Sequence, residues 1–220
     1  RALRQLLADN FPDVKVTSSL SDCDGIDFHC GVMSLPLLLE GASPTDAAPQ
    51  MAYLTVPAER AEAWVQKFAH LKGRKIGLVW AGNAIYQSDH MRSMRADLLQ
   101  PLLDLSDCHF FSLQVGPPAV GMASLKPRVE DLSAQVSNMT DAAAAIAALD
   151  LVISVDTSLA HLGGALGTEV WTMLPHVPDW RWGMKGDTHP LYATTKLFRQ
   201  KTRGDWAGVV SDIRAALAGF

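Results

Sequence analysis

Cysteine is scarce in this sequence, and the few that occur have no paired spacing. Three are present among 220 residues, Cys23, Cys30 and Cys108, and none forms a CxxC pair. An odd number without paired spacing argues against a disulfide framework and fits reduced thiols in a cytoplasmic protein. The seven histidines show no metal-ligand spacing with cysteine or acidic residues, so we expect no zinc site.

Long apolar runs and an excess of positive charge are also missing. No run approaches the roughly 18 apolar residues that a membrane span needs, and no charged-then-apolar signal segment opens the chain. The 19 basic and 23 acidic residues give a formal net charge of −4. This balance lacks the basic footprint of nucleic-acid-binding proteins, so we expect no nucleic-acid partner.

Three common motifs of nucleotide-binding and hydrolytic proteins are absent as well. The chain contains no GxGxxG, no GxxxxGK(S/T) and no GxSxG, which counts against dinucleotide-binding, P-loop and hydrolase functions. What is present is the composition of a compact protein, 48% hydrophobic and 19% charged. The length suits one large domain or one and a half smaller ones.

Apolar strand patterns alternate with helical patterns along most of the chain. The expected strands are 75–82, 108–116, 151–155, 170–175 and 195–200, and the expected helices are 57–71, 95–105, 140–150, 158–167 and 205–220. Continuous apolar strands separated by helices indicate a parallel sheet covered on both faces. The sequence therefore predicts an α/β, Rossmann-like fold.

Composition divides the chain into three parts. Residues 1–40 hold the end of a helix and two strand-like patterns at 14–19 and 27–39, whereas 41–57 is rich in Ala, Pro, Ser and Gly without periodicity. We interpret 41–57 as a linker and 58–220 as the Rossmann-like domain. Because the chain opens on Arg1 inside a helical pattern, we expect a fragment of a longer protein.

Two segments that follow expected strands carry residues suited to an anionic ligand. After the strand at 75–82, Gly82 and Asn83 allow close approach of the backbone, and Arg92 could pair with phosphate oxygens. A solvated surface loop is the alternative. After the strand at 108–116, the amide of Gln114 suits a base or a sugar, with a structural turn as the alternative.

A third such segment, DTSLAH, begins where the strand at 151–155 ends. Thr157 or Ser158 is expected to cap the following helix, whose N–H groups and dipole make a candidate phosphate site. Asp156 fits better as an acceptor for sugar hydroxyls or for the cap, because an acid repels a diphosphate. His161 is either a packing residue or a functional one.

Aromatic and small residues near that segment have two readings as well. Gly163 and Gly164 cost helix stability, roughly 1 kcal/mol each relative to alanine, and indicate that the helix packs closely on a strand or a ligand. Trp180 and Trp182 either stack on a base or cover the end of the sheet. Thr140 or Asp141 is expected to cap the helix at 140–150.

Four stretches together resemble the carboxyl-terminal half of glycosyltransferase family 9-like proteins, relatives of the lipopolysaccharide heptosyltransferases that bacteria often fuse to tetratricopeptide repeats. These stretches are KIGLVWAGN…RS, FFSLQVG, AAAIAALDLVISVDTSLAHLGGALGTEVWTMLPHVPDWRWG and LFRQ…GDWAGVV. The resemblance covers about 57–220. It implies a GT-B architecture, in which this domain holds the nucleotide-sugar donor without a required metal or other cofactor. Residues 1–40 would be the tail of the acceptor-side domain.

The resemblance also assigns roles to individual residues. Asp156 matches an acid that contacts the donor sugar, and Arg92 matches a basic phosphate contact; these two are the expected catalytic residues. The expected substrate-binding residues are Gly82, Asn83, Gln114, Thr157, Ser158 and His161. The first loop departs from the family pattern G-N-P-x-H-x-N-D-x-x-R-S, since Ala84, Tyr86 and Ser88 replace Pro, His and Asn.

The leading hypothesis is therefore inverting transfer of a sugar from a nucleotide-diphosphate sugar to a glycan, a lipid-linked sugar or a protein. The catalytic base would lie outside this chain, upstream tetratricopeptide repeats are a further expected part, and the location would be cytoplasmic or at the inner-membrane surface. The alternative is a non-catalytic module that keeps the fold for ligand binding or protein interaction. A nucleotide-sugar epimerase fits the motifs less well.

Overall fold

The computed structural model describes residues 2–34, 38 and 52–220. Of the linker expected at 41–57, residues 41–51 lie outside this description. None of the helices in the described stretches is long and apolar enough to cross a membrane.

A six-stranded parallel sheet forms the centre of the molecule, with the strand order β3-β2-β1-β4-β5-β6. The strands are β1 (Arg74–Val79), β2 (Cys108–Ser112), β3 (Val129–Asp131), β4 (Leu151–Val155), β5 (Val170–Leu174) and β6 (Thr195–Arg199). The five expected strands are confirmed. β3 was not expected, because its three residues are too few to produce a periodic pattern.

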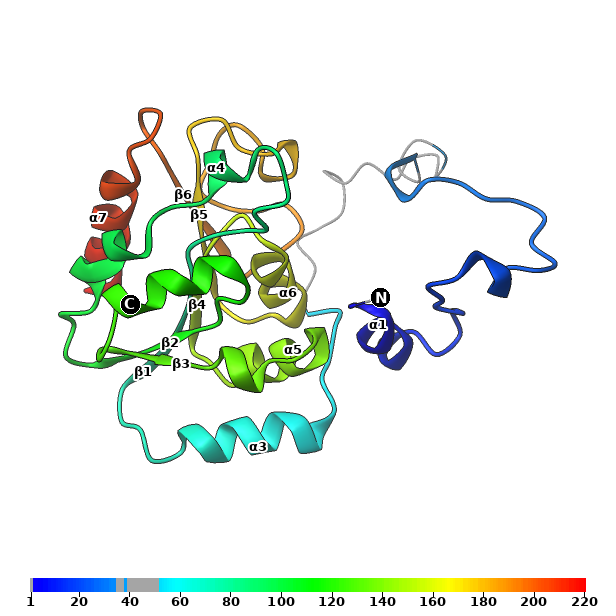
Figure 1. Cartoon of the computed structure of the whole chain (residues 1–220), viewed down its shortest axis with the longest axis horizontal. Coiled ribbons are helices and arrows are strands. Elements are labelled where there is room, and N and C mark those ends of the chain that lie inside the picture. Colours follow the sequence, from blue (N-terminus) through cyan, green and yellow to red (C-terminus); the bar gives the residue numbers. More distant parts are fainter. Residues whose placement is uncertain (1, 35–37, 39–51) are drawn as a thin grey trace.

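Helices cover both faces of this sheet (Figure 1). On one face lie α3 (Ala58–Phe68), α5 (Met139–Ala147) and α6 (Ser158–Leu166), and α1 (Arg4–Asn10) packs against α5. On the other face lie α7 (Trp206–Leu217) and two 3-10 helices, η3 (Ala96–Leu102) and η4 (Pro117–Ser124). The prediction of a parallel α/β sheet covered on both faces is confirmed.

The amino-terminal residues differ most from the expectation. α1 buries Leu6, and the Asn10 side chain donates to the Thr55 carbonyl at 3.0 Å and accepts from its N–H at 2.7 Å. The strand expected at 14–19 is absent, and the described part of 27–39 contains the short η2 (Val32–Ser34), one helical residue at position 38 and no strand. Among the described residues no strand pairs with either segment, and Val14 and Phe28 are exposed.

Two further local expectations are wrong. The α5 helix is capped by Asn138, whose Oδ1 accepts from the N–H groups of Thr140 and Asp141 at 2.9 Å. Asn138 caps the helix because its short side chain brings Oδ1 within reach of two free N–H groups of the first turn. The helix expected at 95–105 is the 3-10 helix η3, which contains Pro101. Proline has no N–H to continue an α-helical ladder.

The order of the strands places a crevice at one edge of the sheet. The chain runs outward from β1 through β2 to β3, and then returns to β4 on the other side of β1. In parallel sheets a ligand crevice opens beyond the carboxyl ends of strands where the order reverses in this way. The loops after β1 and β4, which carry Gly82, Arg92 and Asp156, meet at this point.

Helix α6 packs unusually close to the sheet through its two glycines. A Cβ atom on Gly163 would lie 2.6 Å from Val170 Cγ2, and one on Gly164 would lie 2.5 Å from Tyr192 Cγ. Tyr192 in turn stacks on His189 with 4.6 Å between ring centroids, and Trp182 stacks on His161 at the same distance. The glycines therefore serve packing against a strand and an aromatic cluster.

His189 is held neutral inside this cluster. Its Nδ1 accepts the Leu191 N–H and its Nε2 donates to the Arg181 carbonyl, each at 3.1 Å. The ring is 4% exposed. Burial, assisted by repulsion from His161, lowers the pKa of His189 to about 4.

Replacing Gly164 by alanine is expected to destabilise the protein by about 1–3 kcal/mol, because the new methyl group overpacks against Tyr192. Urea denaturation at an unchanged m-value measures the loss. The matched control is Gly219→Ala, where an added Cβ meets nothing closer than 3.9 Å. Equal stability of the two variants would contradict the close packing.

Stability is also expected to fall as the pH drops from about 6.5 towards about 4, because unfolded His189 takes up a proton that the folded ring refuses. The loss at the lower limit is on the order of 3 kcal/mol. In His189→Gln the loss of stability between pH 6.5 and pH 4 should disappear. His70→Gln, which replaces an exposed histidine, should retain this loss. Denaturation curves recorded between pH 4 and 8 give the free energy of unfolding at each pH. If this free energy depends on pH in the same way in both variants, His189 is not the group responsible.

Candidate functional site

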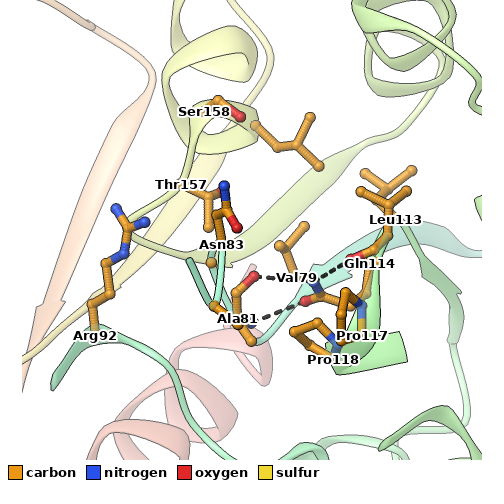
Figure 2. Close-up of a pocket in the computed structure, with 15 residues that line it drawn as sticks. Val79, Ala81, Asn83, Arg92, Leu113, Gln114, Pro117, Pro118, Thr157 and Ser158 are labelled. Atoms are coloured by element: carbon orange, nitrogen blue, oxygen red, sulfur yellow. Dashed lines mark hydrogen bonds between the residues drawn. The ribbon is translucent and has the colours of Figure 1, made fainter. Parts of the chain in front are cut away.

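A cavity of about 510 Å³ lies at the carboxyl ends of β1 and β2, beside the start of α6 (Figure 2). We call it cavity A. Its apolar walls come from Val79, Leu113, Pro117, Pro118 and Leu159. Its polar rim includes Asn83, Arg92, Thr157 and Ser158. An apolar slot with a few polar groups at one end suits a flat ring with a charged substituent.

A second cavity of about 470 Å³, cavity B, adjoins the first. The two share Asn83 and Arg92, and cavity B adds Asp156, Asp179 and Arg181 among its lining residues. Cavity B is therefore bounded by charges of both signs, whereas cavity A is mainly apolar. Arg92 lies at the junction of the two.

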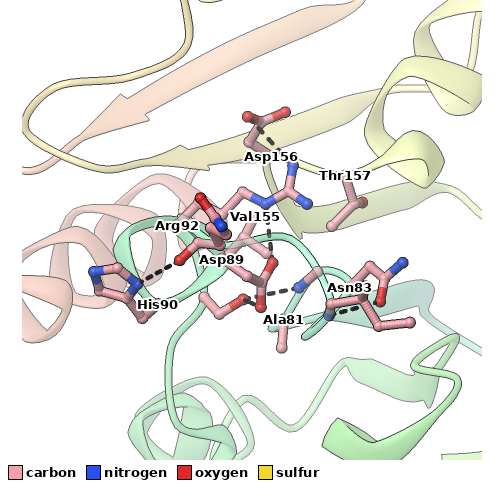
Figure 3. Close-up of polar contacts among 12 residues, drawn as sticks. Ala81, Asn83, Asp89, His90, Arg92, Val155, Asp156 and Thr157 are labelled. Atoms are coloured by element: carbon pink, nitrogen blue, oxygen red, sulfur yellow. Dashed lines mark hydrogen bonds and ion pairs between the residues drawn. The ribbon is translucent and has the colours of Figure 1, made fainter.

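A network of short contacts fixes Arg92 in place (Figure 3). Its Nε donates to Asp89 Oδ1 at 3.0 Å, while Asp89 Oδ2 accepts from Ser93 Oγ at 2.7 Å. Ser93 Oγ accepts the Gly82 N–H at 2.9 Å. A Cβ on Gly82 would run into Asp89 and Arg92. Glycine is required at this position because both side chains pass directly over its backbone.

Asp156 is a buried carboxylate between two nitrogen groups. It is 9% exposed, and its oxygens lie 3.8 Å from Arg92 Nη1 and 3.9 Å from His161 Nε2. His161 Nδ1 lies 3.2 Å from the Tyr192 hydroxyl. Burial lowers the pKa of His161, and the Asp156 charge opposes that shift. Arg92 is therefore the cationic neighbour of this carboxylate.

The first turn of α6 has no side-chain cap, although threonine and serine occupy its start. Thr157 is the N-cap residue but makes no capping hydrogen bond. Its Oγ1 lies 2.9 Å from Ser154 Oγ, which donates to the Val155 carbonyl, so the threonine hydroxyl points inward as a donor. The expectation that Thr157 or Ser158 caps the helix is wrong for Thr157. Thr157, Ser158 and Leu159 of this turn line cavity A, and the first N–H groups of a helix have no partner within the helix.

Gln114 lines cavity A, but its amide is engaged by the backbone. Its Oε1 accepts from the N–H groups of Trp80 and Ala81 at 3.1 and 2.9 Å, and its Nε2 donates to the carbonyls of Ala81 and Val115. The residue ties the carboxyl end of β1 to that of β2. Asn83 lines both cavities, and its Oδ1 accepts the Ile85 N–H at 3.1 Å.

Two residues of this site, Asp89 and Tyr86, were given no role from their sequence pattern. Asp89 positions Arg92, and Tyr86 places its ring 4.9 Å from the Arg92 guanidinium. Of the two tryptophans for which the sequence left two alternatives, Trp182 is buried against His161, while Trp180 is 64% exposed. The signal for Asp89 was its place three residues before Arg92 in a short helix, α4 (Asp89–Arg92). Nothing local indicated Tyr86.

The described residues contain no group of three or more His, Cys, Asp or Glu side chains that could hold a metal ion. The polar side chains that line cavities A and B carry guanidinium, carboxylate, carboxamide and hydroxyl groups.

No family model matches the chain. Protein FlbA of Caulobacter vibrioides is 26% identical over 247 aligned residues, covering 100% of this chain and 40% of that protein. The chain therefore spans less than half the length of this curated relative.

Solved structures with a similar fold include glycosyltransferases. ADP-heptose lps heptosyltransferase II of E. coli has a TM-score of 0.52 at 18% identity, over 76% of this chain and 53% of its own. E. coli heptosyltransferase WaaC with ADP has a TM-score of 0.53 at 18% identity, over 72% and 48%. A family 9 glycosyl transferase from Veillonella parvula has a TM-score of 0.52 at 14% identity, over 81% and 56%. The chain thus has the parallel, helix-covered sheet found in GT-B glycosyltransferases.

Proposed function

We propose that this chain holds the nucleotide-diphosphate sugar donor of an inverting glycosyltransferase. The nucleoside would occupy apolar cavity A, the diphosphate would lie between Arg92 and the start of α6, and the sugar would enter cavity B beside Asp156. Similarity in fold to the heptosyltransferases, one of them solved with ADP, supports this reading.

The observation that carries the proposal is the uncapped first turn of α6, next to the site where cavities A and B meet. The α5 and α7 helices have side-chain caps, Asn138 and Asp205, whereas α1, α3, α4 and α6 have none. Of these uncapped helices, α6 is the one whose first residues, Ser158 and Leu159, line cavity A. Free N–H groups, the positive end of a helix dipole and a guanidinium together form a strong oxyanion site. A diphosphate uses all three.

These residues also suit the chemistry of transfer. In direct displacement, an acceptor oxygen forms the new bond to the anomeric carbon, and the electron pair of the old bond leaves with the diphosphate. Arg92 and the α6 N–H groups would stabilise the charge that develops on this leaving group. Asp156 would accept hydrogen bonds from sugar hydroxyls, and the catalytic base and acceptor would come from outside this chain.

The wider setting follows from the same proposal. The chain would be the carboxyl-terminal half of a family 9-like protein with upstream tetratricopeptide repeats, acting in the cytoplasm or at the inner-membrane surface. The acceptor would be a glycan, a lipid-linked sugar or a protein. No metal or other cofactor would be needed, because Arg92 and the helix dipole would supply the positive charge.

A non-catalytic binding module is the second candidate, and one observation favours it. Arg92 already has two carboxylate neighbours, Asp89 and Asp156, and a ring, Tyr86, where the relatives' pattern has histidine. A guanidinium so engaged suits binding more readily than turnover. A module would bind a nucleotide sugar and never cleave it, so release of free nucleoside diphosphate over time separates the two functions.

Arg92→Ala is expected to weaken nucleoside-diphosphate binding at least tenfold, because a charge-assisted contact contributes about 1.5–3 kcal/mol. ADP, UDP and GDP are screened first by thermal shift, and the best one is titrated by calorimetry. The control is Arg95→Ala, since Arg95 is exposed and paired with Asp97. Unchanged affinity in Arg92→Ala would refute the phosphate role.

Asp156→Asn is expected to separate sugar recognition from nucleotide binding. The variant should keep the affinity for the nucleoside diphosphate within about threefold, but lose most of the extra affinity for the nucleotide sugar, because an amide is a weaker acceptor than a carboxylate. The same titrations measure both. If both ligands lose affinity equally, Asp156 acts through Arg92 and does not contact the sugar.

A further inference from the structure

A third cavity, cavity C, lies beyond cavity B at the carboxyl ends of β5 and β6. Its volume is about 250 Å³. It shares Met91, Pro175 and Val177 with the lining of cavity B, so the two are neighbours along the same rim of the sheet. The LFRQ…GDW stretch, to which the proposed donor site gives no role, supplies four of its lining residues, Gln200, Arg203, Gly204 and Trp206.

The charged and polar residues around cavity C are all donors or imidazoles. Gln200, Arg203, His90 and His176 line it, and no carboxylate is among its lining residues. Within the described part of the chain, Arg203 takes part in no ion pair and is exposed. The nearest acid in sequence, Asp205, has its Oδ1 occupied by the Gly208 N–H at 2.8 Å. Cavity B, in contrast, contains Asp156 and Asp179.

Gln200 carries the clearest sign of a missing partner. It is 5% exposed, and its Oε1 accepts the His176 N–H at 3.2 Å and the Gly204 N–H at 2.9 Å. These two donors fix the orientation of the amide, so that Nε2 is the free end. Nε2 is buried and has no hydrogen-bond partner. A buried donor without an acceptor costs about 1–3 kcal/mol, and the residue lines a cavity that also holds a guanidinium.

His176 is oriented by the same strand end. Its Nδ1 lies 3.3 Å from the Gln200 carbonyl, which can only accept, so Nδ1 carries the proton and donates. His90 Nδ1 is placed in the same way by the Gln87 carbonyl at 3.1 Å. The opposite nitrogen of each ring is thereby left for other contacts. Arg203 and Gln200 Nε2 are therefore the donors suited to an oxyanion, whereas the opposite nitrogen of each ring is an acceptor in the neutral form and donates only when the ring is protonated.

We propose that cavity C binds an anionic oxygen group, a phosphate or a carboxylate, through Arg203 and Gln200 Nε2. Because cavity C continues cavity B, this group belongs either to an acidic sugar substrate that extends past Asp156 or to a free oxyanion. The first source rests on the proposed function, and the second does not. The chemistry that recognises the group is the same in both.

The test follows the Gln200 side-chain amide and the arginine Nε–H signals by NMR on the ¹⁵N-labelled chain. Inorganic phosphate, glucose 6-phosphate, glucuronate and glucose are titrated separately. Phosphate, glucuronate or both should shift the Gln200 amide signal, and glucose should not. If glucose 6-phosphate binds more tightly than phosphate and also shifts Arg181, the group belongs to a sugar; equal or weaker binding assigns the site to a free oxyanion.

Arg203→Ala is expected to weaken binding of the anion about tenfold. The exposed, neighbouring Lys201→Ala, whose lysine pairs with Asp212 and does not line the cavity, should change it less than twofold. Gln200→Glu keeps an acceptor for the His176 and Gly204 N–H groups while replacing the free donor by an anion, and should abolish binding. Equal affinity in Arg203→Ala and Lys201→Ala, or no shift of Gln200 with any anion, would overturn the proposal.

An ADP titration read at the Arg92 Nε–H separates this inference from the donor site. If ADP shifts the Arg92 Nε–H signal while no anion shifts the Gln200 amide signal, the oxyanion site in cavity C is refuted and the donor site is supported. If an anion shifts the Gln200 amide signal while ADP leaves the Arg92 Nε–H signal unchanged, the oxyanion site in cavity C is supported and the donor site is refuted. If inorganic phosphate shifts only the Arg92 Nε–H signal and not the Gln200 amide signal, the oxyanion site in cavity C is refuted.

Discussion

The hydrogen bonds of Asp89 organise the loop after β1, at the rim of the sheet. This buried carboxylate accepts from Ser93 and Arg92 at once, and Ser93 in turn holds the backbone of Gly82. The long loop after β1 is thereby closed on itself, and one guanidinium is fixed at the junction of two cavities. A buried carboxylate is stable only when its charge is balanced and its oxygens are hydrogen-bonded. The same contacts that satisfy Asp89 therefore build the candidate site.

At the other end of the rim, the side chain of Arg199 likewise holds a loop in place through hydrogen bonds. The Arg199 guanidinium donates to the carbonyls of Trp182, Gly183 and Gly186 at 2.6, 2.9 and 2.7 Å, and it takes part in no ion pair among the described residues. Burial lowers its pKa. This arginine fixes the loop after β5, which includes Arg181 and the buried Trp182. The next residue, Gln200, holds the neighbouring backbone, so the end of β6 sets the walls of cavities B and C.

The periodic elements could be predicted from the sequence, and the contacts between them could not. Alternating apolar strands and helices gave the five longer strands and the helix-covered sheet, because burial on both faces leaves a continuous apolar run. The strand expected at 14–19 failed because strand formation depends on a partner, which no local pattern reports. β3 was missed for the opposite reason, since three residues pair with β2 without any periodicity of their own.

At the site, residue type was easier to foresee than geometry. Asp156 and Arg92 stood out as charged residues that follow buried strands, but their approach to 3.8 Å depends on the strand order. Gln114 also stood out, yet its amide is engaged by the ends of two strands. Whether a polar side chain serves the backbone or a ligand is decided by what lies opposite it, and sequence spacing does not contain that information.

Side-chain capping differs among the helices of this protein. A missing N-cap costs a helix about 0.5–2 kcal/mol; α5 and α7 avoid the loss with Asn138 and Asp205, whereas α1, α3, α4 and α6 do not. α6 has a threonine at the right position, and its hydroxyl is turned to Ser154 instead. A protein that leaves donors unsatisfied where a capping residue is already in place sacrifices stability at that point, as functional sites often do. The loss is explained if an external oxyanion completes the helix, which is the role that a donor diphosphate would have.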